Sequence, residues 1–426
     1  MTGELDVQPS HPLPPVPLGA DLSGPYAEYA ALRQAAPVHR VVLPDGATAW
    51  VVTRYADVRA ALADPRLSMN KANGSGAWKG FSLPGALDAN LANMDPPDHT
   101  RIRRLVSQAF TPQRVEKLRP AVQAVADELV DRMAPAGRAD LVAEYAVPLP
   151  VAVICDLLGV PQRDRADLRD WTEAMTTPPP DDPTAAVRAV RELAGFMVRL
   201  IAEKRRDPGD DLISAMIAAR DGVADDAGTS GGTGTPGDPA TAARPADRLG
   251  EDELTSLAFV LLFAGYENSV HAIGTGLLAL LRHPEQLAAA RRHEELPVPV
   301  VEELLRYEPP GPLALRRFPL VDMAIGGVTI PARETVLLGL AAANRDPDRF
   351  PDAEELDVAR PANPHLTLGH GIHYCVGAPL ARMELQIAIG TLLRRFPGLA
   401  LAVPAEELTW RPSYRSRALR GLPVRF

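Results

Sequence analysis

The segment from Glu251 to Arg282 constrains the fold more than any other part of the chain, because it reads as one unbroken helix of 32 residues. At 1.5 Å per residue such a helix crosses about 48 Å, the width of a whole domain. Residues 257–265 are uninterrupted apolar sequence, which indicates a place in the core. No stretch of about 18 apolar residues is free of charge, so we expect no membrane span.

Shorter patterns fill in the rest of the fold. The alternation around Asp45-Gly46 predicts a β-hairpin. Residues 328–340 read as short strands. Helical patterns occupy residues 55–65, 98–110, 114–133 and 378–396, and a proline-rich break at 176–184 separates two further helices. Helices dominate and no βαβ alternation occurs, which predicts a mainly α protein with a small β portion.

The domain organisation follows from low-complexity sequence. Residues 1–20 contain a proline-rich stretch and are expected to form an extended arm. Residues 21–426 are expected to form one domain, with a low-complexity insertion at about 225–248. A long loop is predicted from Leu67 to Pro97, and its apolar side chains suggest a functional role.

Composition narrows the functional classes. The chain of 426 residues has a formal net charge of −9, which argues against a nucleic-acid surface built from clustered Lys and Arg. Its two cysteines cannot build a disulfide framework. Residues 1–20 lack the apolar core of a signal peptide, so we expect a cytoplasmic protein.

Cys375 lies in a segment that reads LGHGIHYCVGAPLAR. Gly369 permits positive φ and close approach to a flat partner. Gly377 follows the cysteine and Pro379 suits the first turn of a helix, so Cys375 precedes a helix N-terminus. The free N–H groups and the positive dipole at that end stabilise a thiolate, so we expect a lowered pKa and a ligand for a soft or oxidisable metal.

A cysteine can also be a buried apolar residue or a zinc ligand, and each possibility applies to one cysteine of this chain. Cys155 has uniformly apolar neighbours and is expected to be a small buried hydrophobe. Cys375 could instead join His365, His370 and His373 in a zinc site, although their spacing does not match a usual zinc finger.

The segment around Cys375 closely resembles the haem-binding signature of the cytochrome P450 family, the haem-thiolate monooxygenases. The resemblance implies the cytochrome P450 fold, with the long helix over a haem b and the cysteine loop beneath it. It implies that Cys375 is the axial ligand of the haem iron. It covers nearly the whole chain, because other landmarks of the family recur in order.

Those landmarks assign further residues. Glu303 and Arg306 match the Glu-x-x-Arg helix and Arg360 matches its third partner, which implies a buried structural ion network. Haem propionates need cationic donors. The resemblance places them at His99, Arg103, Arg317 and His373, with Arg317 preferred to Arg316 by its distance from Gly326-Gly327, and places Gly369 and Gly377 at the haem.

The long helix carries the stretch that resembles the family's oxygen-binding motif. Ala264, Gly265 and Glu267 match it, and the resemblance implies that the acid supports proton delivery. Asn268 departs from the usual Thr and has no hydroxyl proton to relay. Proton delivery then falls to Ser269, to a water or to a hydroxyl of the substrate. A second departure is Leu368, where the family usually has Phe.

The resemblance also implies partners. No flavin or nicotinamide module is fused to the chain, so electrons would come from a separate ferredoxin and ferredoxin reductase. The oxidant would be O2. We expect the enzyme to be a monomer. Candidates for the docking face are Arg101, Arg104, Arg394 and Arg395.

The expected substrate is a hydrophobic small molecule, hydroxylated or epoxidised, such as a polyketide, macrolide or terpenoid. The alternatives are oxidative coupling or rearrangement, prompted by Asn268, and haem binding without turnover. Expected substrate contacts are Trp78, Phe81, Leu87, Trp171, Met175, Val260, Phe263, Leu313, Leu315 and Tyr414.

Overall fold

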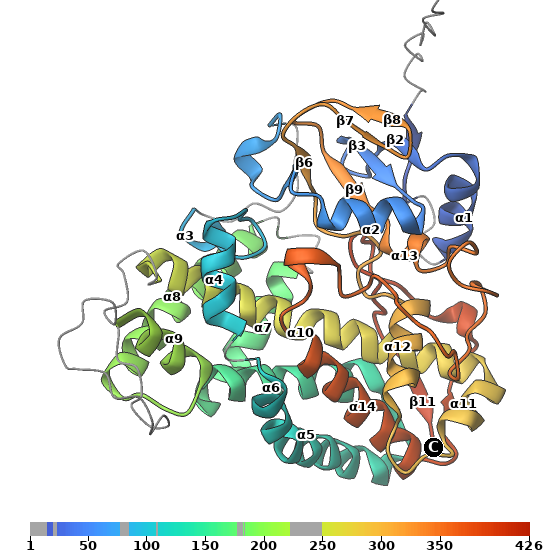
Figure 1. Cartoon of the computed structure of the whole chain (residues 1–426). Helices are drawn as coiled ribbons and strands as arrows, with labels where there is room; N and C mark the ends of the chain where they lie inside the picture. Colours follow the sequence, from blue (N-terminus) through green and yellow to red (C-terminus); the bar gives the residue numbers. More distant parts are fainter. Residues whose placement is uncertain are drawn as a thin grey trace, which may run out of the picture.

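Helices dominate the described part of the chain, as the sequence predicts (Figure 1). The structure is a computed structural model that describes residues 15–19, 24–76, 85–107, 110–176, 182, 184–221 and 249–426. Its α-helices are α1 (Tyr26–Ala35), α2 (Tyr55–Ala63), α3 (Gly85–Asp88), α4 (Asp98–Ser107), α5 (Pro112–Met133), α6 (Pro148–Leu158), α7 (Arg165–Thr176), α8 (Ala185–Arg206), α9 (Leu212–Asp221), α10 (Glu251–Arg282), α11 (Pro284–Ala290), α12 (Val298–Tyr307), α13 (Leu340–Ala343) and α14 (Ala378–Arg395).

The strands are short and form small sheets. They are β1 (Val16–Pro17), β2 (Val38–Val42), β3 (Thr48–Val52), β4 (Leu67–Ser68), β5 (Arg138–Asp140), β6 (Phe318–Pro319), β7 (Met323–Ile325), β8 (Val328–Ile330), β9 (Val336–Leu338), β10 (Ala400–Leu401) and β11 (Pro423–Arg425). The largest sheet has the order β1-β2-β3-β9, in which β2 and β3 form the predicted hairpin and β9 pairs parallel to β3. This sheet lies with α1 and α2 at one end of the molecule (Figure 1).

Helix α10 has the bounds that the sequence predicts and runs through the helical part of the molecule (Figure 1). At its start the side chain of Glu253 accepts a hydrogen bond from the N–H of Gly250 at 2.7 Å, which satisfies a backbone donor at the helix N-terminus. It packs against α3, α6, α8 and α14. By length and composition α10 could span a membrane, but 61% of its most apolar window is buried inside the protein. Its apolar character is that of a core helix.

Hydrogen bonds within the loop and to α12 hold the segment before α14 in place. Cys375 donates its N–H to the carbonyl of Leu368 at 2.8 Å, which closes the cysteine loop. Thr367 ties the start of that loop to α12, because its hydroxyl donates to the carbonyl of Leu305 at 2.7 Å. The loop turns at Gly369 and Gly371, whose φ angles are 79° and 76°, values that side chains other than glycine rarely adopt.

One part of the sequence analysis needs revision. The segment from Leu67 to Pro97 is not one continuous loop, because β4 pairs with β6 and α3 packs against α10. In the predicted arm, Val16 and Pro17 pair with the hairpin and Leu18 is buried. The low-complexity insertion at 225–248 lies outside the described residues.

Candidate active site

A cavity of about 390 Å³ separates α10 from the cysteine loop. Its walls are mainly apolar and come from segments that lie far apart in the sequence. They include Leu62, Phe110, Ala264, Gly265, Asn268, Leu313, Leu315, Arg317, Gly369, Cys375 and Gly377. The cavity therefore brings the cysteine loop face to face with the predicted oxygen-binding stretch of α10.

Cys375 is exposed toward this cavity, whereas Cys155 is fully buried as predicted. Burial raises the pKa of the Cys375 thiol, although the N–H of Gly377 and the guanidinium groups of Arg103 and Arg382 act in the opposite direction. The sequence analysis expected the helix N-terminus to lower this pKa. In the protein alone, loss of solvation outweighs those donors.

Arginine and histidine side chains gather beside the cysteine. His99 and His373 are tilted against each other with ring centroids 4.2 Å apart. Burial, together with Arg317, His99 and Arg103, lowers the pKa of His373 to about 3. Burial likewise lowers the pKa of Arg317 to about 10. Burial is the largest cause in both cases, and neighbouring cationic groups add to it.

The same groups show what kind of ligand fits here. Both ring nitrogens of His99 and the Nε and Nη1 atoms of Arg317 are buried and have no hydrogen-bond partner in the described part of the chain. Buried donors are rarely left unpaired. Arg317 lines the cavity, whereas Arg316 instead donates to the carbonyl of Met69 at 3.4 Å. The donors therefore fit a flat, dianionic group such as a haem with its two propionates.

The opposite wall belongs to α10. Ala264 and Asn268 are exposed toward the cavity, and Gly265 and Ser269 also line it. A Cβ on Gly265 would meet Cδ1 of Ile154 at 2.7 Å, so this glycine lets α10 approach α6 closely. Glu267 is not part of the wall; its Oε1 lies 3.7 Å from Nε2 of His271, four residues along the same helix.

A carboxylate from α14 lies where the sequence analysis placed none. Glu384 lines the cavity and its Oε2 accepts the hydroxyl of Ser269 at 2.7 Å, while its Oε1 has no partner among the described residues. Burial raises the pKa of Glu384 to about 8, against the smaller effect of the Ser269 hydrogen bond. Glu384 therefore holds a proton at neutral pH.

Glu303 and Arg306 of α12 meet Arg360 in a buried network. Glu303 accepts hydrogen bonds from Nε and Nη2 of Arg306, each at 2.8 Å, and from Nε of Arg360 at 3.1 Å. Asn363 and the N–H of Asp357 complete the shell of Glu303, at 2.9 and 2.8 Å. Arg306 also donates to three carbonyls of the segment that leads to the cysteine loop.

Comparison with known proteins agrees with this geometry. The family model described as Cytochrome P450 matches residues 295–400. The chain is 45% identical over 417 residues to the cytochrome P450 monooxygenase PikC of Streptomyces venezuelae, covering 96% of this chain and 93% of the relative. The chain belongs to the cytochrome P450 family.

Two further comparisons extend the match. The 6-deoxyerythronolide B hydroxylase of Saccharopolyspora erythraea is 42% identical over 409 residues, which cover 94% of this chain and 95% of the relative. The tirandamycin C-bound P450 monooxygenase TamI superposes with a TM-score of 0.82 at 40% identity, over 96% of this chain and 100% of that structure. This cytochrome P450 is thus a monooxygenase with the predicted fold. Its cofactor is haem with an axial cysteine thiolate, and enzymes of this type use O2 and redox partners to oxidise small molecules.

The predicted substrate contacts divide into three groups. Leu313 and Leu315 line the cavity of this cytochrome P450. Trp78 and Phe81 lie outside the described residues. The others do not line it: Leu87 and Met175 are buried in the hydrophobic core, Trp171, Val260 and Phe263 are partly buried against that core, and Tyr414 packs against the β1–β3 cluster. Apolar residues near a cavity mostly serve the core, which sequence alone cannot separate from a ligand wall.

The zinc alternative does not hold in the described part of this cytochrome P450, where no group of three His, Cys, Asp or Glu side chains is placed to bind a metal ion. His365 is engaged elsewhere, with Nε2 at 3.2 Å from Glu302. His373 faces His99 rather than a shared metal position.

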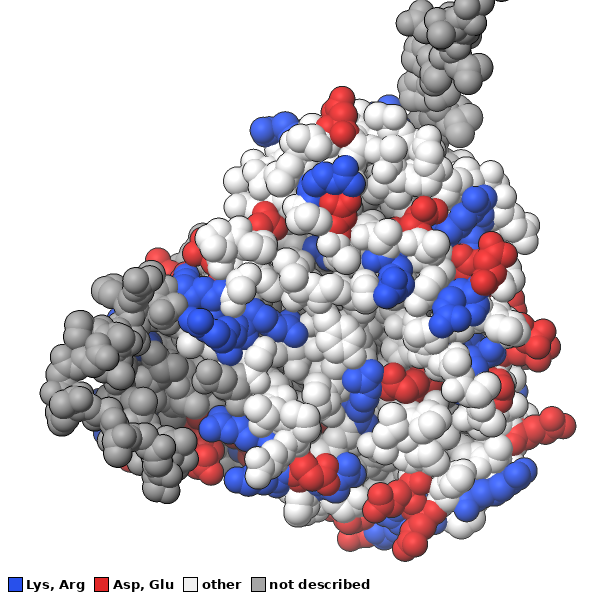
Figure 2. Space-filling view, in the orientation of Figure 1, with Lys and Arg blue, Asp and Glu red and all other residues white. Residues whose placement is uncertain are grey.

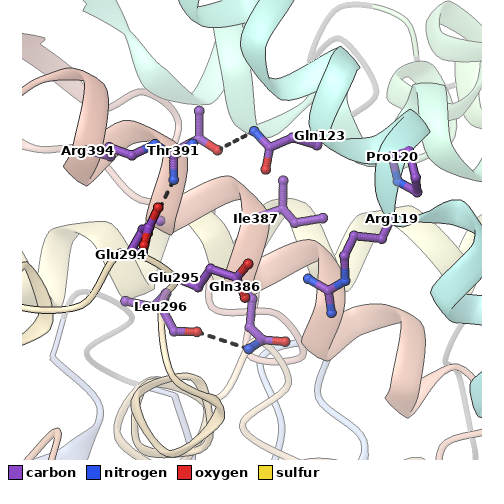
Figure 3. Close-up of a pocket in the computed structure, with 11 residues that line it drawn as sticks. Arg119, Pro120, Gln123, Glu294, Glu295, Leu296, Gln386, Ile387, Thr391 and Arg394 are labelled. Carbon is purple, nitrogen blue, oxygen red and sulfur yellow. Dashed lines mark hydrogen bonds between the residues drawn. The ribbon is translucent and has the colours of Figure 1, made fainter.

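A second cavity of about 400 Å³ lies between α5, α14 and the segment before α12 (Figure 3). Its polar side chains already bind one another, as Gln123 donates to Thr391 at 3.0 Å and Gln386 donates to the carbonyl of Leu296 at 3.0 Å. It borders the far half of α14, roughly 20 Å along the helix from Cys375. The chemistry of this cytochrome P450 therefore belongs to the first cavity.

Proposed function

We propose that this cytochrome P450 hydroxylates or epoxidises a hydrophobic secondary metabolite such as a polyketide, macrolide or terpenoid. The mainly apolar cavity between Cys375 and α10 carries this proposal. The names of the relatives, among them a deoxyerythronolide hydroxylase, support the substrate class. Leu313 and Leu315 would contact the substrate on the wall formed before β6.

We assign the haem contacts residue by residue. Cys375 would hold the iron, and His99, Arg103, Arg317 and His373 would bind the propionates, because their donors are buried without acceptors or lie beside the cysteine. Gly369 and Gly377 would allow the flat ring to approach the loop. When bound, a haem thiolate supplies the electron donation that favours cleavage of the O–O bond.

We propose that protons enter through Ser269 and Glu384. The Glu384 carboxyl holds a proton and lies at 2.7 Å from the Ser269 hydroxyl, which can both donate and accept. Both residues line the cavity, whereas Glu267 faces His271. Asn268 faces the cavity beside them and would orient water or substrate through its amide. Ala264 and Gly265 would leave room for O2.

Electrons would come from a ferredoxin and its reductase. Basic side chains gather over α4 on the face shown in Figure 2. Arg101 is bound to Glu253, Arg394 donates to the carbonyl of Glu294 and Arg395 is bound to Asp131. Arg101, Arg104, Arg394 and Arg395 all remain docking candidates. We place the enzyme in the cytoplasm, as a monomer.

Asn268 keeps one alternative open, an oxidative coupling or rearrangement that needs less proton delivery than hydroxylation. A product that lacks a new oxygen atom would favour this alternative. Haem binding without turnover is the remaining one, and it would show as substrate binding without NADPH consumption.

The first experiment tests the ligand. Reduced wild-type protein with carbon monoxide should give the red-shifted Soret band of a thiolate-ligated haem. Cys375→Ala should lose this band and Cys155→Ala, the matched control, should keep it. A colourless wild-type protein would overturn the assignment.

The second experiment tests the activity. A screen of macrolides, polyketides and terpenoids should find compounds that shift the Soret band by displacing water from the iron. Compounds that bind should then be oxidised in the presence of NADPH and a surrogate ferredoxin system. Binding without any product across the whole set would contradict the proposed activity.

A further inference from the structure

Arg382 on α14 connects the cysteine loop to α12. Its Nε and Nη2 atoms donate to the two carboxylate oxygens of Glu302 at 2.6 and 2.9 Å. Its Nη1 atom donates to the hydroxyl of Tyr374 at 3.2 Å. The side chains of Arg382 and Glu302 are 27% and 17% exposed, so this fork is largely shielded from water. Tyr374 is the residue directly before Cys375.

His365 completes the group from the other side. Its Nδ1 accepts the N–H of Thr367 at 3.2 Å, and a backbone N–H can only donate. The ring proton therefore sits on Nε2, 3.2 Å from Glu302. Although burial opposes it, the hydrogen bonds from Arg382 and His365 lower the pKa of Glu302 to about 2. Glu302 is thus an ion throughout the neutral range.

Neither the structural network nor the proposed proton route uses this group. Glu302 and Glu303 are neighbours on α12, yet Glu303 faces Arg306 and Arg360 while Glu302 faces the cysteine loop. Arg382 lies on the helix that follows Cys375 and binds the residue directly before it, so its charge sits beside the cysteine loop. A bidentate guanidinium–carboxylate pair fixes that charge in place.

We propose that Glu302, Arg382 and Tyr374 form a clamp that sets the position and the electron donation of the Cys375 thiolate. The Tyr374 hydroxyl, held by Arg382, fixes the backbone just before the cysteine. The positive Arg382 draws electron density from the thiolate, and Glu302 balances that charge. These are positioning residues, and the inference rests on Cys375 being the haem ligand. Hydrogen bonds and charges around a ligand tune its metal in this way.

The reduction potential of the bound haem tests the electrostatic part of the clamp. Arg382→Gln removes a positive charge beside the thiolate, which should lower the potential because the reduced iron loses stabilisation. Glu302→Gln leaves Arg382 unbalanced, which should raise the potential. Shifts of opposite sign are expected from charge, whereas loosening of the fold would move both variants in the same direction.

Arg132 and Glu128 provide a matched control, because they form an exposed ion pair at 2.7 Å on α5. Arg132→Gln and Glu128→Gln should leave the potential of the haem unchanged. Arg382→Lys replaces Arg382→Gln if the latter fails to bind haem. Because lysine keeps the positive charge, its haem should have a reduction potential close to that of the wild type. The reduction potential of Glu302→Gln should still be higher than that of the wild type. Equal or absent shifts in haem-loaded variants would overturn the clamp.

Tyr374→Phe tests the positional part, because it removes only the hydroxyl that Arg382 binds. Its carbon monoxide complex should convert to the form without thiolate at lower denaturant concentration than the wild type. Unchanged conversion would overturn the role of Tyr374. A wild-type protein that never shows the thiolate band would overturn the assignment of Cys375 as the haem ligand. A wild-type protein that shows the band, with variants that do not differ from it, would overturn only the clamp.

Discussion

Glu303 and Glu384 are both buried, with 0% and 1% of their surface exposed, yet their surroundings differ completely. Glu303 faces the guanidinium groups of Arg306 and Arg360, together with Asn363. Glu384 faces one hydroxyl, that of Ser269, and leaves an oxygen unpaired at the cavity wall.

The comparison shows that neighbours, rather than burial, decide what a buried carboxyl does. A carboxylate between two arginines is held as an ion and fastens segments together, because its charge is balanced and hydrogen-bonded. A carboxyl with only a hydroxyl partner keeps its proton, since ionisation in the protein interior has no compensation. The first arrangement stabilises the fold, and the second provides a proton beside the active site.

The largest effect is expected from breaking the Glu303 network. Arg306→Ala should lower the free energy of unfolding by about 3–5 kcal/mol, because buried Glu303 loses one of its two guanidinium partners. Little haem-loaded protein should be recovered, as measured by the Soret absorbance per protein. Arg132→Ala, which breaks an exposed pair, should cost at most about 1 kcal/mol. Normal haem content in Arg306→Ala would show that the network does not hold the cysteine segment.

Glu384→Gln should affect the reaction rather than the fold. Glutamine keeps the size and the contact with Ser269 but cannot supply a proton from an ionisable group. General acid–base groups contribute about 10²–10⁴-fold, so product formation should fall by that order while the substrate-induced Soret shift persists.

Two variants serve as comparisons for Glu384→Gln. Ser269→Ala should show a loss in the same direction, with more hydrogen peroxide formed per NADPH consumed. Glu267→Gln should lose less activity, because Glu267 faces His271 outside the cavity wall. If Glu267→Gln shows the larger loss, the proton route runs along α10 and the assignment of Glu384 is wrong.

The pH dependence of the free energy of unfolding tests whether Glu384 is protonated in the folded protein. The folded pKa of Glu384 is about 8, above the value of about 4.3 expected in the unfolded chain. Between these values the folded protein keeps a proton that the unfolded chain releases, so this group lowers the free energy of unfolding as pH rises. The stability of Glu384→Gln relative to wild type should therefore increase from about pH 5 to about pH 8 in denaturant titrations. A difference that does not change with pH would mean that Glu384 is ionised in the folded protein.

Local sequence signals predicted the parts of this molecule that depend on local physics. The bounds of α10 follow from its apolar length, and the hairpin follows from Asp45-Gly46. Cys375 stands out because glycines and a helix start surround it. Each of these features is encoded within a few neighbouring residues.

The missed residues depend on partners that are distant in sequence. Glu384 differs from Glu302 only in what it meets after folding, and its one sequence signal is an acid within the apolar part of α14. The clamp joins Glu302 to Arg382 and His365, which no local pattern connects. The raised pKa of Cys375 likewise reflects burial by the whole fold, against the helix end that predicted the reverse.

The smallest effect is expected from Asn268→Thr, which restores the hydroxyl that this chain lacks. Asn268 is exposed toward the cavity, so a threonine fits without displacing a packed neighbour. If Ser269 and Glu384 already deliver protons, a second hydroxyl beside them adds little. Product formed per NADPH should then change by less than about twofold, well below the rate contribution of a general acid–base group. The informative test combines the two changes: Asn268→Thr with Glu384→Gln should remain as slow as Glu384→Gln alone. Recovery of activity in the double variant would show that a hydroxyl at position 268 can supply protons independently, and Glu384 would then be only one of two routes into the cavity.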